Sequence, residues 1–182
     1  MKIGIDISQL AYQNTGVANL TKNLIENLLK IDQKNEYIFF FSSLRRHLNF
    51  EYVPFLNQAT SPYKNFTLKY AKLPPTALDM LWNKFHVLPI ESFLGNIDIF
   101  ISSDWTQPPV KKAKSATILY DLIIYKYPEE MDKKIVETHK RRLAWVKEEC
   151  DIVFCISEST KRDAMKILKI PENKLKVVYP GA

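Results

Sequence analysis

The alternation of strand-like and helix-like segments is the feature of this chain that most restricts its fold. Short apolar runs typical of buried parallel strands occur at residues 3–7, 37–41, 66–71, 97–101, 116–120, 152–156 and 175–179. Segments with apolar residues at helical spacing lie between them, at about 17–31, 76–94, 129–149 and 158–168. Parallel strands need crossover connections, which are usually helical. This order therefore predicts an α/β fold with a doubly wound, mostly parallel sheet and helices on both faces.

Length and composition fit a single domain that covers residues 1–182. The chain is 46% hydrophobic and 25% charged, and it contains no internal repeat or low-complexity tract. Its formal net charge of +6 fits acidic ligands, an anionic membrane surface or nucleic acid, and it fits an ordinary basic surface equally well. The basic cluster at 140–142, which ends in Arg142, is balanced by nearby glutamates. We therefore expect a solvated helix face there and no nucleic-acid partner.

Cysteine usage and the amino terminus predict a cytoplasmic protein. Cys150 and Cys155 flank the strand-like run DIVF, and alternation along a strand places them on opposite faces. We expect reduced thiols in the core rather than a disulfide, as is usual in the cytoplasm. The start MKIGIDIS lacks the features of a signal peptide, and no apolar run approaches the roughly 20 residues that span a bilayer.

The segment 76–94 is a mixed helical segment that Pro89 interrupts, and it leaves two interpretations open. It mixes Trp82 and Phe85 with Lys84 and His86, which fits a peripheral contact with the inner face of the membrane. The same mixture fits a helix that covers the core and exposes a few aromatic side chains.

A polar loop after the first strand is a candidate anion site. It reads SQLAYQNTG, and Gly16 opens the first helix, where backbone N–H groups and the helix dipole could hold a phosphate. The candidate residues are Asn14, Thr15, Gly16 and Val17. The loop has one glycine, without GxGxxG or GxxxxGK[ST], so neither a dinucleotide site nor a P-loop is expected. The alternative is an ordinary turn in which Asn14 or Thr15 caps the helix.

Polar clusters also follow two later strands. Asp104 and Trp105 come after the run 97–101, where a carboxylate and an aromatic ring suit a sugar or another polar ligand. The alternative is a turn whose tryptophan covers the edge of the core. Tyr120 and Asp121 end the next strand, and Asp121 could bind ligand hydroxyls or cap the following turn. In an open parallel sheet ligands bind outside these carboxyl ends, so the clusters belong to one edge.

The last polar cluster and the three histidines give weaker evidence for a binding or catalytic site. Ser157 stands where a helix begins and Glu158 suits its first turn, so capping explains both, and a ligand contact is the sharper alternative. His47, His86 and His139 are far apart in sequence and fit surface or packing positions, so no metal site is expected. The chain has no GxSxG motif for a hydrolase.

Six segments together carry a resemblance to a known family. They are IGIDISQLAYQNTGVANLTKNLIENLL, DMLWNKFHVLP, IDIFISSDW, YDLIIYKYPE, CDIVFCISESTKRD and IPENKLKVVYPGA. In this order they resemble the amino-terminal domain of GT-B glycosyltransferases, specifically the retaining family four with its mannosyl- and glucosyltransferases. The resemblance runs over nearly the whole chain.

The resemblance implies two Rossmann-like domains that face each other across a cleft. The amino-terminal domain would hold a sugar or lipid-linked acceptor, and a carboxy-terminal domain would hold the nucleotide-diphosphate sugar. The latter is a co-substrate, and no metal or other cofactor is implied. By this similarity the loop from Asn14 to Val17 approaches the donor phosphates. Asp121 faces the transferred sugar or the acceptor, and Ser157 and Glu158 line the cleft floor.

The chain departs from the family pattern in one respect. Many relatives carry His-Asp where this chain has Tyr120-Asp121, and a phenol with an ordinary pKa near 10 is a poor substitute for imidazole. By the same resemblance a donor-binding domain would follow residues 1–182, and the closing YPG resembles an interdomain hinge. We therefore expect residues 1–182 alone to transfer no sugar. A non-catalytic binding or scaffold module and a membrane-docking domain are the alternative functions.

Overall fold

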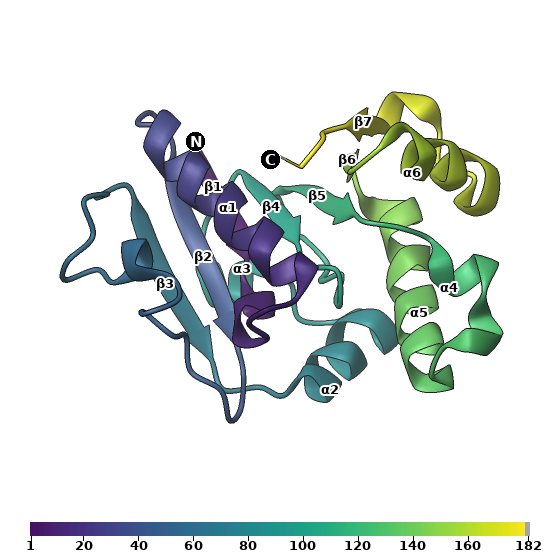
Figure 1. Ribbon diagram of the computed structural model, residues 1–182, viewed down its shortest axis with the longest axis horizontal. Coiled ribbons are helices and arrows are strands. Elements are labelled where there is room, and N and C mark those ends of the chain that lie inside the picture. The colour runs from purple at the N-terminus through teal and green to yellow at the C-terminus, as the bar shows by residue number, and fades with distance from the viewer. Residues whose placement is uncertain (181–182) are drawn as a thin grey trace.

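The computed structural model describes residues 1–180, and within them seven parallel strands form one sheet (Figure 1). The strands are β1 (Lys2–Asp6), β2 (Glu36–Ser42), β3 (Phe66–Ala71), β4 (Ile99–Ser102), β5 (Lys114–Leu119), β6 (Ile152–Cys155) and β7 (Leu175–Val177). Their bounds differ from the predicted runs by at most two residues. The predicted doubly wound α/β fold is confirmed.

The order of the strands places one crevice at the middle of the sheet. The order is β3-β2-β1-β4-β5-β6-β7, so the chain moves from β1 toward one edge and from β4 toward the other. β1 and β4 are hydrogen-bonded neighbours, with Ile3 opposite Ile99 and Ile5 opposite Ile101. Connections that leave two adjacent strands in opposite directions open a crevice at their carboxyl ends, where ligands bind in such folds.

The aromatic residues of β2 show how helices cover both faces of the sheet. Phe39 and Phe41 pack into the cluster that contains α1 (Gly16–Ile31). Phe40 points to the opposite face and packs with Trp82. That second face is covered by α2 (Pro75–Leu78), the π turn η3 (Asp79–Lys84) and α3 (Glu91–Leu94). Figure 1 shows α1 lying along β1 and β2.

The remaining helices pack with the second half of the sheet. They are α4 (Ile123–Lys126), α5 (Lys133–Glu149) and α6 (Glu158–Asp163), which continues as the π turn η5 (Ala164–Leu168). Short 3-10 turns are η1 (Ser8–Ala11), η2 (Pro54–Leu56), η4 (Pro128–Glu130) and η6 (Glu172–Lys174). The helix expected from residue 129 begins four residues later, because Asp132 accepts hydrogen bonds from the N–H groups of Lys134 and Ile135 and caps α5 there.

The structure confirms the predicted apolar face of α5 and corrects the prediction for its basic face. Val136, Leu143 and Val146 are buried, as the helical spacing predicted. Arg142, however, is 2% exposed, so the prediction that the basic cluster faces solvent was wrong at this residue. Arg142 is buried because its guanidinium donates a hydrogen bond to the hydroxyl of Thr117 in β5.

The segment 76–94 is interrupted, as predicted, but the interruption begins before Pro89. It is broken after Lys84, and His86 and Leu88 have positive φ angles of 52° and 63°, which no continuous helix allows. Trp82 is fully buried and its indole N–H donates to the carbonyl of Leu88, so it belongs to the core and offers nothing to a membrane. Within residues 1–180, no helix combines the length and apolar character that crossing a bilayer requires.

The two cysteines are free and buried, as predicted. Burial raises the pKa of Cys150 and of Cys155 to about 11, which keeps both thiols protonated and unreactive at neutral pH.

Candidate functional site

A pocket of about 360 Å³ lies at the crevice between the carboxyl ends of β1 and β4. Its volume lies at the lower end of the range of small-molecule sites. Asp6, Ser8 and Gln9 line it from the end of β1 and the turn that follows, and Asp104 and Trp105 line it from the loop after β4. The expectation that the strand ends share one edge is therefore met for these two strands, each of which is followed by a loop that the sequence had singled out.

Asp6 is the residue at this edge that sequence reasoning missed. It ends β1, its side chain is buried, and one carboxylate oxygen accepts from the backbone N–H of Ser8 at 2.9 Å and from its hydroxyl at 2.5 Å. Burial raises the pKa of Asp6 to about 6, against the opposing effect of the Ser8 hydrogen bonds, and the charge of Asp104 adds to the rise. The available signal was a carboxylate at the end of the otherwise apolar run IGID.

Asp104 and Trp105 form the facing wall of the pocket. The amide nitrogen of Gln9 donates to an oxygen of Asp104 at 3.1 Å. The amide oxygen of Gln9 is buried without a partner among residues 1–180, and so is the indole N–H of Trp105. Buried polar groups without partners are costly, and they are usually satisfied by water or ligand. Two residues of the pocket wall thus hold an unpaired acceptor and an unpaired donor, both shielded from solvent.

In the loop from Asn14 to Val17, helix capping is observed. The Thr15 hydroxyl accepts from the N–H of Ala18 at 3.2 Å and donates to the carbonyl of Tyr12 at 3.0 Å. Thr15 and Val17 line the pocket, while Asn14 and Gly16 are exposed beside it. The capping alternative holds for Thr15. A Cβ added at Gly16 would meet no atom within 4 Å, so packing does not require glycine there.

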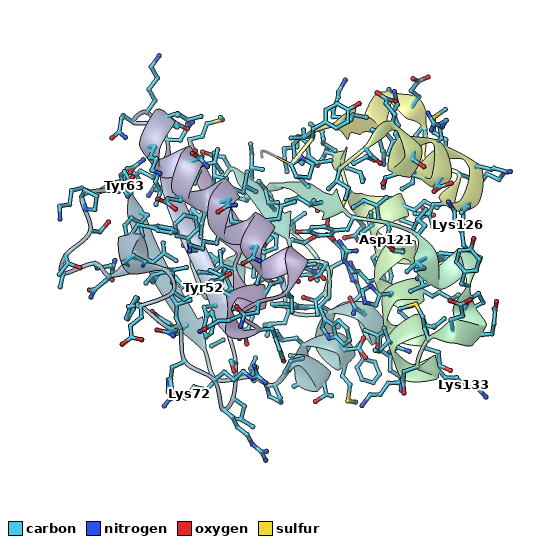
Figure 2. The ribbon with its side chains drawn as sticks, in the orientation of Figure 1. Tyr52, Tyr63, Lys72, Asp121, Lys126 and Lys133 are labelled. Atoms are coloured by element: carbon cyan, nitrogen blue, oxygen red, sulfur yellow. The ribbon has the colours of Figure 1, made fainter. Side chains whose placement is uncertain are left out.

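Tyr120 and Asp121 lie one strand away and do not line the pocket. Burial raises the pKa of Tyr120 to about 12, and the charge of Asp104 adds to the rise, so the phenol keeps its proton near neutral pH. Asp121 is exposed and accepts from the N–H of Ile123 at 3.0 Å, which is the turn-capping alternative. Figure 2 shows it where the chain leaves β5 toward α4.

Ser157 and Glu158 also occupy capping positions. The Ser157 hydroxyl accepts from the N–H of Thr160 at 3.1 Å, and Glu158 is exposed in the first turn of α6. The Thr160 hydroxyl donates to the carbonyl of Tyr120 at 3.0 Å, which ties this helix start to the end of β5. Neither Ser157 nor Glu158 lines the pocket.

A buried polar network connects α5 to the strands under the edge. Arg142 donates to the hydroxyl of Thr117, which is 2.8 Å from the hydroxyl of Ser102. The Ser102 hydroxyl lies 2.6 Å from the amide oxygen of Gln107, whose amide nitrogen donates to Ser115 at 3.0 Å. Within residues 1–180 the guanidinium has no carboxylate within ion-pair distance. It is therefore a buried positive charge without a direct ion pair, on which the charges of Asp104 and Asp6 act from a longer distance.

Comparison with known proteins adds no family. No family model matches the chain, and a search of curated proteins finds no match. In the part of the chain that the structure describes, no three His, Cys, Asp or Glu side chains gather as a metal ion would need.

Proposed function

We propose that this chain is the acceptor-binding domain of a retaining glycosyltransferase. The complete enzyme would transfer a hexose, such as mannose or glucose, from a nucleotide-diphosphate sugar to a sugar or lipid-linked acceptor. One observation carries the proposal: the pocket lies at the switch point of the sheet and combines two carboxylates with an aromatic wall. The sequence resemblance supports the same assignment.

The chemistry of the pocket wall suits a sugar. A sugar ring presents hydroxyl groups that both donate and accept, and it has apolar C–H faces that pack on aromatic rings. Asp6 and Asp104 provide acceptors, and beside them the oxygen of Gln9 and the N–H of Trp105 are buried polar atoms without a partner among residues 1–180. Tyr12 lines the pocket as a second aromatic ring.

The donor side of the proposal rests on the start of α1. Capping satisfies Ala18, which leaves the N–H groups of Gly16 and Val17 without acceptors among residues 1–180. These groups suit a phosphate oxygen. No lysine or arginine lines the pocket, although stabilising a leaving diphosphate usually needs cations. We therefore assign those cations to a further domain, and we expect residues 1–182 alone to be inactive.

The test is a transfer assay with the protein and whatever sequence its gene encodes beyond Ala182. Nucleotide-diphosphate hexoses are combined with simple and lipid-linked sugar acceptors, and both donor consumption and product are measured. We expect sugar transfer, and we expect Asp104→Asn to reduce its rate. The control Asp98→Asn, at the amino ends of the strands, should leave the rate unchanged. A complete protein that consumes no donor across the panel contradicts the proposal.

Tyr120 favours a second candidate function, a non-catalytic binding module of the same fold. With a pKa raised to about 12 by burial, its phenol cannot act as a base at neutral pH. The variant Tyr120→His separates the two functions. Transfer by the wild type supports the enzyme, and transfer that appears only in the variant supports the binding module.

A further inference from the structure

A patch of exposed basic and apolar side chains lies at the carboxyl ends of β2 and β3. This basic patch consists of Leu44, Arg45, Arg46, Tyr70 and Lys72. The N–H of Ser43 donates to the carbonyl of Ala71 at 3.2 Å, which brings the loop after β2 next to the loop after β3. Figure 2 shows Lys72 where the chain leaves β3. Ser42, directly before the first loop, lines the pocket, so the basic patch borders it.

The charges of the basic patch are not neutralised by the fold. Arg45, Arg46 and Lys72 have no carboxylate within ion-pair distance among residues 1–180. The chain segments that form the patch, 42–50 and 70–78, contain no aspartate or glutamate. Like charges that gather without counter-charges repel each other and attract anions. The patch therefore suits an anionic partner.

Arg46 is held in place and joins the basic patch to the pocket. Its Nη1 donates to the carbonyl of Ala11 at 2.9 Å, and its guanidinium carbon lies 4.5 Å from the centroid of the Tyr12 ring. Tyr12 itself lines the pocket. A surface bound at the patch would therefore lie directly beside the pocket.

Two apolar side chains of the patch indicate which anionic partner fits. Leu44 is 55% exposed and Tyr70 is 56% exposed. Apolar side chains of this kind enter the boundary between lipid headgroups and acyl chains, and neighbouring cations attract anionic lipids. Nucleic acids are held mainly by polar and basic side chains on phosphates, where an exposed leucine adds nothing. The combination favours a lipid surface.

We propose that the basic patch binds an anionic lipid surface and that the pocket faces its headgroup layer from beside the patch. The docking does not depend on sugar transfer. Its consequence for the acceptor rests on the proposed function: a protein held on lipid meets acceptors that are anchored there. The acceptor class is then the lipid-linked sugar.

The first experiment measures sedimentation of the protein with vesicles of phosphatidylcholine, with and without phosphatidylglycerol. We expect binding that requires the anionic lipid and weakens as salt is added, because salt screens exposed charges. Arg45→Gln and Lys72→Gln should each lower the partition coefficient by about fivefold, the effect of one basic residue near such a surface. Both side chains are exposed, so these variants leave the core unchanged.

Lys34→Gln is the matched control. Lys34 is exposed at the amino ends of the strands, between α1 and β2, and its replacement removes the same charge. This variant should bind vesicles as the wild type does. Leu44→Ser should weaken vesicle binding by a factor that salt does not reduce, because the burial of apolar surface is not screened.

Two results would overturn the proposal. The first is no binding to anionic vesicles, or equal partition coefficients for Arg45→Gln, Lys72→Gln and Lys34→Gln. The second is binding to a single-stranded RNA or a DNA duplex that is tighter than binding to the vesicles and is unaffected by Leu44→Ser. That result would assign the basic patch to a nucleic acid.

The second experiment compares a lipid-linked acceptor in anionic vesicles with a water-soluble acceptor in the transfer assay. Arg45→Gln should raise the KM for the lipid-linked acceptor more than the KM for the soluble one. Equal effects on the two KM values would contradict the link between the basic patch and the acceptor. A protein that binds vesicles but transfers no sugar keeps the docking surface and contradicts the proposed function alone.

Discussion

Asp6 gives the sharpest test of how the pocket is built. The variant Asp6→Asn keeps the size of the side chain and an oxygen that accepts both hydrogen bonds from Ser8, and it removes the buried charge. Burial raises the pKa of Asp6 from 3.8 to about 6. At about 1.4 kcal/mol per pH unit, ionising Asp6 therefore costs the folded protein roughly 3 kcal/mol.

The sign of the effect follows from proton binding. Between pH 4 and 6 the folded state holds the Asp6 proton more tightly than the unfolded state does. The stability from this group is therefore complete below pH 3.8 and is lost as the pH rises through about 6. Asp6→Asn should match the wild type near pH 4 and exceed it by up to about 3 kcal/mol at pH 8.

Urea denaturation of both proteins from pH 4 to 8 measures this difference. Asp151→Asn is the matched control. Burial alone would raise the pKa of Asp151, but hydrogen bonds from the Ser115 N–H and from Lys114 bring it below the usual value. That variant should lose stability by a similar amount across the whole range. A pH-independent difference for Asp6→Asn, or a loss at pH 8, would show that burial does not destabilise the charged form of Asp6.

Three further predictions concern the donor loop and the core. Gly16→Ala should leave the free energy of unfolding unchanged or raise it by about 0.5–1 kcal/mol, because the added Cβ meets open space. In a calorimetric titration the same variant should bind a nucleotide diphosphate more weakly. Cys150 and Cys155 should resist a thiol reagent at pH 8 until urea unfolds the protein, and fast labelling of the folded state would contradict their burial. Trp82→Ala should cost about 3–5 kcal/mol in urea denaturation, as for a core tryptophan, and a loss below about 1 kcal/mol would place Trp82 outside the core.

The sheet was predictable because each buried strand is an apolar run with turn residues around it. The order of the strands was not, since pairing β1 with β4 joins segments about a hundred residues apart by contacts that no local pattern records. The pocket depends on that order. Asp104 and Trp105 could be proposed from the sequence, but their meeting with Asp6 and Gln9 could not.

The helical spacing of apolar residues gave wrong predictions where tertiary contacts decide the conformation. Arg142 follows the pattern of a solvated face, yet the hydroxyl of Thr117 draws it inside. The segment 76–94 has helical spacing, but positive φ angles at His86 and Leu88 turn the chain back onto Trp82.

The capping alternatives were correct at three of the proposed sites. Thr15, Asp121 and Ser157 each accept hydrogen bonds from the backbone at the start of a helix or turn. Such residues are common wherever a strand leads into a helix. A polar residue at a strand end therefore becomes a functional candidate when, as for Gln9 and Trp105, its polar atoms stay buried and unpaired.

The indole N–H signals of the three tryptophans would show whether the switch-point pocket binds a sugar. Trp82 donates to the carbonyl of Leu88 and Trp145 to that of Asn83, whereas Trp105 has no acceptor among residues 1–180. Titration with a panel of methyl hexosides should therefore shift the Trp105 signal and leave the other two in place. A Trp105 signal that responds to no sugar, or equal shifts of all three signals, would contradict the account.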